Sequence, residues 1–365
     1  MFEEQRLRYD LCILLLITAT FMTFGVIFVY SSSSFYAFEK MQQPFFYVKK
    51  QLFGIMIGAL GFWLTKKIPL QIFKQTTFFI LLIATILTAI TMTPLGFKVH
   101  GSQRWLNLAG FLFQPSELLK IAIVLHMSSF LSRKKLTDKN LTTLIPILGL
   151  IGCISIILLK QPDFGCMVTI CTTTMIMLFI ANLPIRYFVG AVASSVPLIF
   201  ILIYTQPYRW QRIVTYLNPW QDPQGSGFQI IQALIAEGSG GVWGNGIAQS
   251  KQKFLYLPMQ HTDFIFAIIA EEIGFIGSSL LIILCILFVW FGFRISWKLK
   301  DQFSVFLVQG ITTMISLQFI INLFVATGLA PTKGIGLPFI SYGNTALVCN
   351  MLMIGLIVNA VQDNY

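Results

Sequence analysis

Long apolar runs separated by short polar connections dominate the pattern of this 365-residue chain. A transmembrane helix needs roughly 20 mostly apolar residues to cross about 30 Å of hydrocarbon. Ten runs approach that length, at about 11–31, 48–65, 75–93, 115–132, 142–159, 165–182, 187–205, 264–291, 304–329 and 336–360. The first run is longer than the apolar core of a cleaved signal peptide, so we expect it to remain as a helix. The pattern predicts an all-α, polytopic membrane protein of about ten transmembrane helices, with residues 1–365 forming a single domain.

One connection is much longer than the others and covers residues 206–263. Connections of this length are uncommon unless they are functional. Glycines, which let the backbone approach a ligand closely, crowd between Gly225 and Gly246, and the apolar spacing over 229–236 predicts a short helix. Aromatic residues that could enter the membrane interface or stack on sugars are Trp210, Trp220, Phe228, Trp243 and Tyr256. The alternative is a solvated loop anchored by its aromatics, but the glycines, four basic residues and an acid favour a site.

The composition excludes an ordinary soluble domain, because 56% of the residues are hydrophobic and only 11% are charged. Lysine and arginine lie mainly in alternate connections, among them Lys134, Lys135 and Lys139. The positive-inside rule then predicts a cytoplasmic N-terminus and an extracytoplasmic 206–263 loop. The net charge of +11 is explained by this topology and by attraction to anionic lipid, so no nucleic-acid partner is expected. All six cysteines fall in apolar runs without a C-x-x-C pair, which predicts packing residues and no metal site.

Several charged residues lie in or beside the apolar runs, where an ionised group is expensive. Glu117 and Lys120 are three residues apart and share a helix face. They form either a self-satisfied ion pair or a site in which Lys120 meets an anionic substrate. Asp163 is expected to be a first-turn acid favoured by the helix dipole, and Glu271 and Glu272 are expected to pair within the bundle.

Asp263 lies where the long loop enters the eighth run, close to His261 and Lys253. Burial at such a border raises the pKa of a carboxyl group, which would make it a base near neutral pH. The same position suits a helix N-cap. Position in the sequence leaves both roles open.

Five motifs in order along the chain resemble the SEDS family of shape, elongation, division and sporulation proteins, which includes RodA, FtsW and SpoVE. They are GSQRWLNLAGFLFQPSELLKIAIV, KQPDFG, NPWQDPQGSGFQIIQALIAEGSGGVWGNGIAQSKQKFLYLP, HTDFIFAIIAEEIGFIG and GLAPTKGIGLPFISYG. The forms NPWQDPQGSGFQ and PTKG, with the Ser250–Lys253 stretch, favour the FtsW-like branch.

The resemblance implies a peptidoglycan glycosyltransferase of the bacterial cytoplasmic membrane. Its substrate would be lipid II, a disaccharide-pentapeptide on undecaprenyl diphosphate, polymerised at the outer face. Asp263 matches the family's catalytic acid, and Trp105, Glu117 and Lys120 match other functional positions. His261 and Ser341 lie in family motifs and are candidate substrate-binding residues. The implied partners are a class B penicillin-binding transpeptidase and proteins of the division or elongation complex.

Three positions depart from the family pattern. Met259 and Gln260 follow Pro258 where a glutamate is usual, Glu237 replaces an uncharged residue, and Asn344-Thr345 replaces Gly-Ser. One acid near Asp263 is thus lost and another gained, so we expect the charge of the site to be rebalanced.

The implied reaction needs a base for the acceptor sugar's 4-hydroxyl and cations for the departing diphosphate. Asp263 is the candidate base, and the candidate cations are Arg104, Lys120, Arg209, Arg212, Lys253 and Lys333. A divalent cation, Mg²⁺ or Mn²⁺, could assist, although no ligand cluster demands one. Two alternatives remain: a lipid II flippase or transporter, and a non-catalytic scaffold of a cell-wall complex.

Overall fold

The computed structural model describes residues 2–99, 102–108, 110–133, 144–254, 257–258 and 260–364. The basic residues Lys134, Lys135 and Lys139, the aromatic Tyr256 and the variant position Met259 lie outside the described residues.

Twelve α-helices form within this part of the chain, which confirms the all-α prediction. They are α1 (Phe2–Met41), α2 (Phe46–Lys67), α3 (Leu70–Ile90), α4 (Pro115–Arg133), α5 (Ile145–Lys160), α6 (Phe164–Ile180), α7 (Ile185–Tyr204), α8 (Pro207–Leu217), α9 (Phe228–Ser239), α10 (Ile265–Ser296), α11 (Gln302–Ala326) and α12 (Asn344–Gln362). Ten of them lie at the ten predicted runs. The other two, α8 and α9, lie in the long loop, and α9 covers the short helix expected over 229–236.

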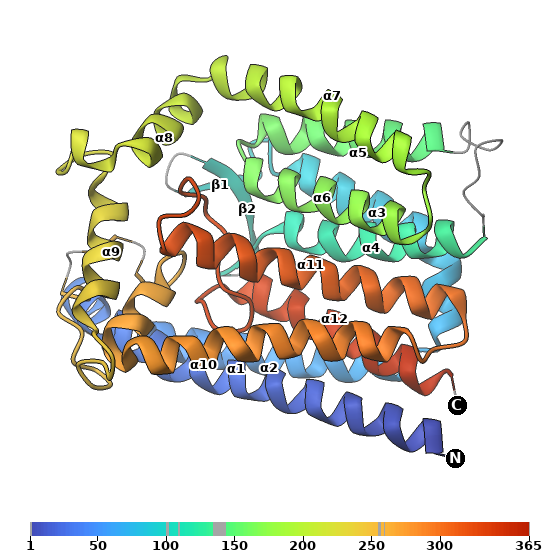
Figure 1. The fold of residues 1–365 in the computed structure, drawn as a ribbon, viewed down its shortest axis with the longest axis horizontal. Helices are drawn as coiled ribbons and strands as arrows, with labels where there is room; N and C mark the ends of the chain where they lie inside the picture. The colour runs from blue at the N-terminus through green and yellow to red at the C-terminus, as the bar shows by residue number, and fades with distance from the viewer. Residues whose placement is uncertain are drawn as a thin grey trace.

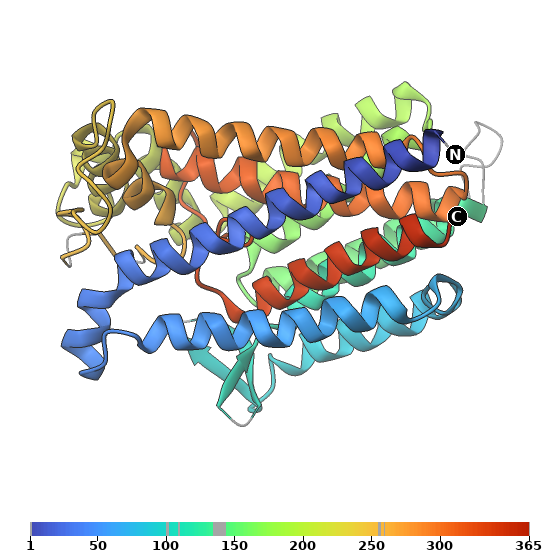
Figure 2. The same cartoon turned by 90° about the horizontal axis from the view of Figure 1, so that it is seen from below.

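Six helices are long and apolar enough to cross a membrane by length and composition: α1, α3, α7, α10, α11 and α12. The apolar helices α5 and α6 are shorter, and α4 is buried along most of its length between α3 and α11. These helices form one bundle of roughly parallel and antiparallel rods (Figures 1 and 2). The protein is therefore a multi-pass membrane protein.

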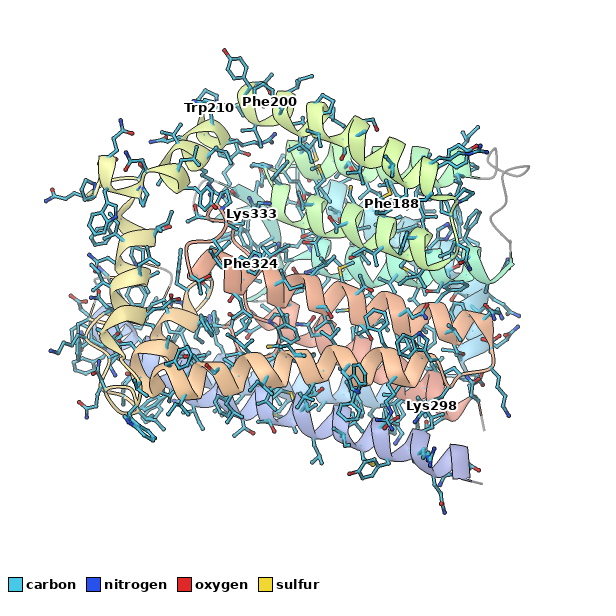
Figure 3. All side chains as sticks on the ribbon, in the orientation of Figure 1. Phe188, Phe200, Trp210, Lys298, Phe324 and Lys333 are labelled. Carbon is cyan, nitrogen blue, oxygen red and sulfur yellow. The ribbon has the colours of Figure 1, made fainter. Side chains whose placement is uncertain are left out.

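Two ends of the bundle differ in character. Both termini lie at one end, whereas α8, α9 and a small sheet lie at the other (Figures 1 and 2). Figure 3 shows Lys333 and Trp210 toward the α8 end and Lys298 toward the termini. We call the end that carries α8 and α9 the loop end.

The sheet was not predicted, because residues 94–114 read as a plain connection. Strands β1 (Gly96–Val99), β2 (Ser102–Leu108) and β3 (Phe111–Phe113) form an antiparallel sheet in the order β1-β2-β3. Phe97 lies opposite Trp105, and Leu106 lies opposite Phe113. The last predicted run was wrong at its start, because α12 begins only at Asn344. Residues 336–343 form turns, bends and irregular backbone instead, because Pro338 disfavours the helical conformation at Leu337 before it.

Helix α10 contains a break at Gly274, where φ is 66° and ψ is −167°. The glycine-rich segment 240–246 packs into the break and replaces the missing helical hydrogen bonds. Asn245 N donates to Glu271 O at 3.0 Å, and Phe275 N donates to Gly241 O at 2.9 Å. The long loop is thus clasped to α10 by backbone pairing.

The side chains of Glu271 and Glu272 fasten the next part of the loop. Glu271 accepts hydrogen bonds from the Ser250 hydroxyl at 2.5 Å and from Lys251 N at 2.8 Å. Glu272 accepts from the Ser31 hydroxyl at 2.5 Å, and Lys253 Nζ lies 3.4 Å from the same oxygen. The predicted structural pairing of these two glutamates is confirmed.

Candidate active site

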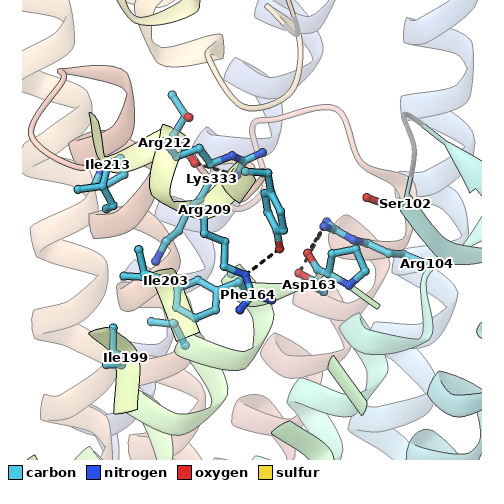
Figure 4. A pocket seen from close by; sticks show the side chains of 17 residues that line it. Ser102, Arg104, Asp163, Phe164, Ile199, Ile203, Arg209, Arg212, Ile213 and Lys333 are labelled. Atoms are coloured by element: carbon cyan, nitrogen blue, oxygen red, sulfur yellow. Dashed lines mark hydrogen bonds and ion pairs between the residues drawn. The ribbon is translucent and has the colours of Figure 1, made fainter. Parts of the chain in front are cut away.

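A cavity of about 570 Å³ opens at the loop end, between β2, the start of α6, the end of α7, α8 and residues 331–334 (Figure 4). Its lining is of two kinds. The cationic side chains are Arg104, Arg209, Arg212 and Lys333, and the apolar ones include Phe164, Val168, Ile199, Ile203 and Ile213. Four of the six cations predicted from the sequence therefore share one cavity, beside an apolar wall.

Two of the four cations are held by backbone carbonyls and a carboxylate. Arg104 donates to Pro162 O at 2.5 Å and lies 3.7 Å from Asp163 Oδ1. Arg209 is buried and donates to the Tyr208 hydroxyl at 2.8 Å and to Leu202 O at 2.9 Å. Both guanidinium groups are fixed in place without losing all of their donors.

The other two cations come from α8 and from the 331–334 segment. Arg212 donates to Thr332 O at 2.9 Å. Lys333 Nζ lies 5.0 Å from the centre of the Phe164 ring, and Arg209 lies 5.3 Å from the same ring. Phe164 therefore stabilises two cations through its π-system. Burial, and then the charge of Arg212, lowers the pKa of Lys333 from its usual value. Like charges gathered in this way bind an anion well, because an anion relieves their repulsion.

Asp163 is the acid that lines the cavity, and it occupies the predicted position at a helix start. It is the N-cap of α6: its carboxylate accepts from Cys166 N at 3.3 Å and from the Ser116 hydroxyl at 3.3 Å. Its oxygens are engaged in fixing α6 and Arg104 rather than open to the cavity.

Asp263 lies at the edge of the cavity. A Cβ placed on the cavity-lining Gly334 would be 3.4 Å from Asp263 Oδ2. Asp263 is not the cap of α10, because Phe264 holds that position and no side chain caps the helix. Among the described residues, no side-chain or backbone donor is hydrogen-bonded to its carboxylate. This carboxylate is thus free to accept a proton.

Burial raises the pKa of Asp263 to about 7, while the charges of Arg212 and Arg104 oppose the rise. Near neutral pH the group therefore exists in both forms, as a general base requires. Its half-buried position beside solvent allows proton exchange.

Replacing Arg212 with Gln is expected to raise the pKa of Asp263 further, because it removes the larger of the two opposing charges. A rate that depends on deprotonated Asp263 rises with pH through the pKa of this group. In the variant, the midpoint of that rise should lie roughly half a pH unit to one unit higher. A pH–rate profile of the purified variant measures this. A midpoint that stays fixed, or moves to lower pH, would contradict the assignment of that rise to Asp263.

Two predicted cations lie outside the cavity. Lys120 is buried in α4, 2.7 Å from Glu117 Oε2 and 2.9 Å from Gln318 Oε1. The structure therefore contains the self-satisfied Glu117–Lys120 pair. Lys253 is held at Glu272, as described above, so it pins the loop rather than facing an anion.

The remaining candidates also lie outside the cavity lining. Trp105 follows Arg104 on β2, so its side chain points to the opposite face of the strand. His261 is buried, with its ring 4.5 Å from the Tyr47 ring, and burial lowers its pKa to about 4. Ser341 donates to Thr262 O at 2.6 Å and accepts from Leu337 N at 2.7 Å. His261 and Ser341 thus support the segment that carries Asp263.

Glu237, the unusual acid, lies on α9 outside the cavity lining. Burial raises its pKa to about 8. It is therefore mostly protonated near neutral pH and adds little negative charge to the loop end.

The structure adds cavity residues that the sequence did not single out, chiefly Phe164, Tyr208 and Gly334. Gly334 lies within the PTKG motif, which was the one signal available for it. Phe164 becomes a partner of Arg209 and Lys333 only because the start of α6 meets α8 and residues 331–334, whereas Tyr208 precedes its partner Arg209 on α8.

Among the described residues, no three His, Cys, Asp or Glu side chains come together as ligands of one ion. A divalent cation that bridges substrate oxygens usually needs only one or two carboxylates. Of the two described carboxylates at the cavity, Asp163 is engaged by Ser116 and Cys166 and Asp263 is the candidate base, so neither is assigned to a metal.

The fold and cavity together define a class: a polytopic membrane protein with a cationic, half-apolar site at one end of its bundle. The chain matches the family model described as cell cycle protein FtsW/RodA/SpoVE over residues 11–365. It is 38% identical to stage V sporulation protein E of Bacillus subtilis over 352 residues, which cover 95% of each protein. It is 39% identical to the probable peptidoglycan glycosyltransferase FtsW of Geobacter sulfurreducens over 354 residues, 96% of this chain and 95% of the relative. The chain therefore belongs to the FtsW, RodA and SpoVE family, as its motifs predicted.

Two solved structures share the fold. A chain of a peptidoglycan synthase complex superimposes with a TM-score of 0.79 at 24% identity, covering 96% of this chain and 97% of that one. The rod shape determining protein RodA of Thermus thermophilus superimposes with a TM-score of 0.72 at 22% identity, covering 96% of each chain. At these identities the likeness concerns the fold.

Proposed function

We propose that this protein is a peptidoglycan glycosyltransferase that polymerises lipid II into glycan strands, with Asp263 as the general base. The observation that carries the proposal is the position of the Asp263 carboxylate, which has no hydrogen-bond donor among the described residues, at the edge of a cavity with four cations. The family relatives named peptidoglycan glycosyltransferase support it.

The reaction assigns a role to each part of the cavity. The 4-hydroxyl oxygen of the acceptor sugar forms a bond to the anomeric carbon of the donor, and its proton passes to Asp263. The bond between that carbon and the diphosphate breaks, and the diphosphate leaves with its electron pair. A single displacement of this kind inverts the configuration at the anomeric carbon.

The cations stabilise the leaving group, because preorganised charges act most strongly where negative charge develops. Arg104, Arg209 and Arg212 offer planar groups of donors that match phosphate oxygens, and Lys333 adds a compact charge. The isoleucines of α7 and α8 form the apolar side of the same cavity. A diphosphate joined to a long hydrocarbon chain fits both halves at once.

The orientation of the site follows from the charge pattern of the sequence. With a cytoplasmic N-terminus in the bacterial inner membrane, the loop end faces outward, where lipid II is polymerised. The resemblance to FtsW favours a role in cell division over elongation. A class B penicillin-binding transpeptidase is the proposed partner, and the match to a chain of a peptidoglycan synthase complex supports this.

A lipid II flippase is the alternative function. Transporter sites lie near the midplane of the membrane, at paired broken helices. Here the cavity lies at the loop end, and the α10 break is closed by the long loop. These features favour polymerisation.

The deciding experiment supplies lipid II to purified protein in detergent, alone and with its transpeptidase partner. We expect glycan ladders on a gel, and we expect the ladders to depend on Asp263. Translocation of lipid II in vesicles without ladders would instead support the flippase. Normal growth of cells carrying only Asp263→Asn would support a non-catalytic scaffold.

A further inference from the structure

The backbone of the segment that carries Asp263 is held by three successive hydrogen bonds. His261 O accepts from Tyr342 N at 2.9 Å, and Thr262 O accepts from the Ser341 hydroxyl at 2.6 Å. The third carbonyl, Asp263 O, accepts from Asn322 Nδ2 at 2.9 Å. The first two donors come from the turn before α12, whereas the third comes from α11.

Asn322 also reaches the cavity wall. The same Nδ2 atom donates to Ile335 O at 2.8 Å, so both amide hydrogens are used. Ile335 directly follows Lys333 and Gly334, which both line the cavity, and Gly334 lies against Asp263. Asn322 is fully buried, and among the described groups none is bonded to its Oδ1 atom. A buried amide with an unpaired oxygen costs free energy, and the two hydrogen bonds that Asn322 donates offset that cost.

We propose that Asn322 is a positioning residue, which fixes Asp263 relative to the cations by joining the backbone of Asp263 to that of Ile335. This inference rests on the proposed function, because it assigns Asn322 a role in the same reaction. Asn322 does not line the cavity. It acts through Asp263, and it sets where the carboxylate lies against Gly334.

The structure supplies a reason why the bond to Asp263 O matters. The amide of Ala267 donates to Phe264 O, so the first turn of α10 leaves Asp263 O outside the helical ladder. Without Asn322, no donor among the described residues remains bonded to that carbonyl, and the bonds to His261 O and Thr262 O still hold the residues before it. The change is therefore confined to Asp263 and its link to residues 333–335. A displacement of about 1 Å at a reacting group costs about 10²-fold in rate.

The chain contains a matched control for the experiment. Asn359 on α12 also bridges two backbone carbonyls, those of Thr65 and Ile68, at 2.6 Å each. It is likewise buried, and it lies near the end of α12, which runs to the C-terminus (Figure 1). Asn322→Leu and Asn359→Leu each keep the approximate volume and remove two amide donations.

The two variants and the wild type are compared for lipid II polymerisation as full-length proteins with the transpeptidase partner. We expect Asn322→Leu to lower kcat about 10- to 100-fold, with KM for lipid II changed less than about twofold. We expect Asn359→Leu to lower the Tm by about as much as Asn322→Leu does, but to keep the kcat of the wild type. Equal kcat in the two variants, while the wild type makes ladders, would overturn the role of Asn322 and leave the proposed function standing.

A second measurement does not depend on activity. The titration of the Asp263 carboxylate is followed by infrared difference spectroscopy against Asp263→Asn, in the wild type and in both leucine variants. We expect the midpoint to move in Asn322→Leu by at least about half a pH unit, and to stay in Asn359→Leu, because only the first alters the distance from Asp263 to Arg212 and Arg104. An unchanged midpoint in Asn322→Leu would overturn the inference even if the wild type formed no ladders. If Asn322→Leu does not fold, Asn322→Ser replaces it in both measurements, with Asn359→Ser as its control.

Discussion

Asparagine in place of Asp263 is expected to reduce glycan polymerisation by about 10²- to 10⁴-fold, the range in which positioned general bases act. The substitution keeps the size of the side chain and removes its ability to take a proton. The cations of the cavity are unchanged, so binding of the lipid diphosphate should persist. The measurement is a comparison of initial rates of ladder formation, together with KM for lipid II.

The control is Asp363→Asn, which removes an exposed carboxylate just after α12, away from the cavity. It should polymerise at the wild-type rate. A polymerisation rate of Asp263→Asn within threefold of the wild type would remove Asp263 from the mechanism. A joint loss in both variants would instead indicate a general sensitivity of the protein to lost charge.

The wild-type rate should also depend on pH in a defined direction. Because the pKa of Asp263 is raised from 3.8 to about 7, the base is protonated and inactive in acid, and the rate should rise with pH through about 7. The same shift affects folding. A raised folded pKa makes the contribution of Asp263 to the free energy of unfolding complete below pH 3.8, and that contribution is lost as the pH rises through 7. The site is thus least favourable for stability in the form that it needs for catalysis.

Much of this architecture could be predicted from the hydrophobic pattern, because a helix that crosses lipid must satisfy its backbone internally and be apolar over its whole length. The ten predicted runs correspond to ten helices for that reason. The sheet between α3 and α4 escaped prediction because β1 has only four residues and β3 only three, too few to show an alternation. The start of α12 was misplaced because the segment 336–343 is as apolar as a helix but is broken by Pro338.

The site could be predicted only in part. Side-chain type and the side of the membrane selected six cations, and four of them meet in the cavity. Lys120 and Lys253 fit the same criteria, but they pair with the buried glutamates Glu117 and Glu272. A buried charge without a partner is strongly destabilising, so these lysines are held away from the cavity. Asn322 carried no sequence signal, because an asparagine in an apolar helix does not reveal which carbonyls it will meet.

Alanine in place of Gly274 is expected to destabilise the protein strongly. The backbone of Gly274, at φ 66° and ψ −167°, lies in a region that is essentially restricted to glycine, and other residues there cost about 1–3 kcal/mol. A Cβ would also lie 2.2 Å from Gly244 N and 2.6 Å from the carbonyl carbon of Trp243. These are backbone atoms of the 240–246 segment, so they cannot rotate away as a side chain would.

Relief of that contact would require the 240–246 segment to withdraw from α10. The pairs that join Asn245 to Glu271 and Phe275 to Gly241 would then break, and the turn of α10 that follows Asp263 would lose its anchor. A total cost of about 3 kcal/mol or more corresponds to a fall of roughly 4 °C or more in Tm for a chain of 365 residues. Thermal unfolding of the purified protein in detergent measures it.

Gly149→Ala is the matched control, because a Cβ at this position in α5 meets nothing within 4 Å. That variant should keep its Tm or gain slightly, since alanine is favoured over glycine within a helix. If Gly274→Ala had the same Tm as Gly149→Ala, the backbone pairing of residues 240–246 would not anchor α10. In that case the direction of the helix that follows Asp263 would have to be set by its packing on α1, α9 and α11 alone.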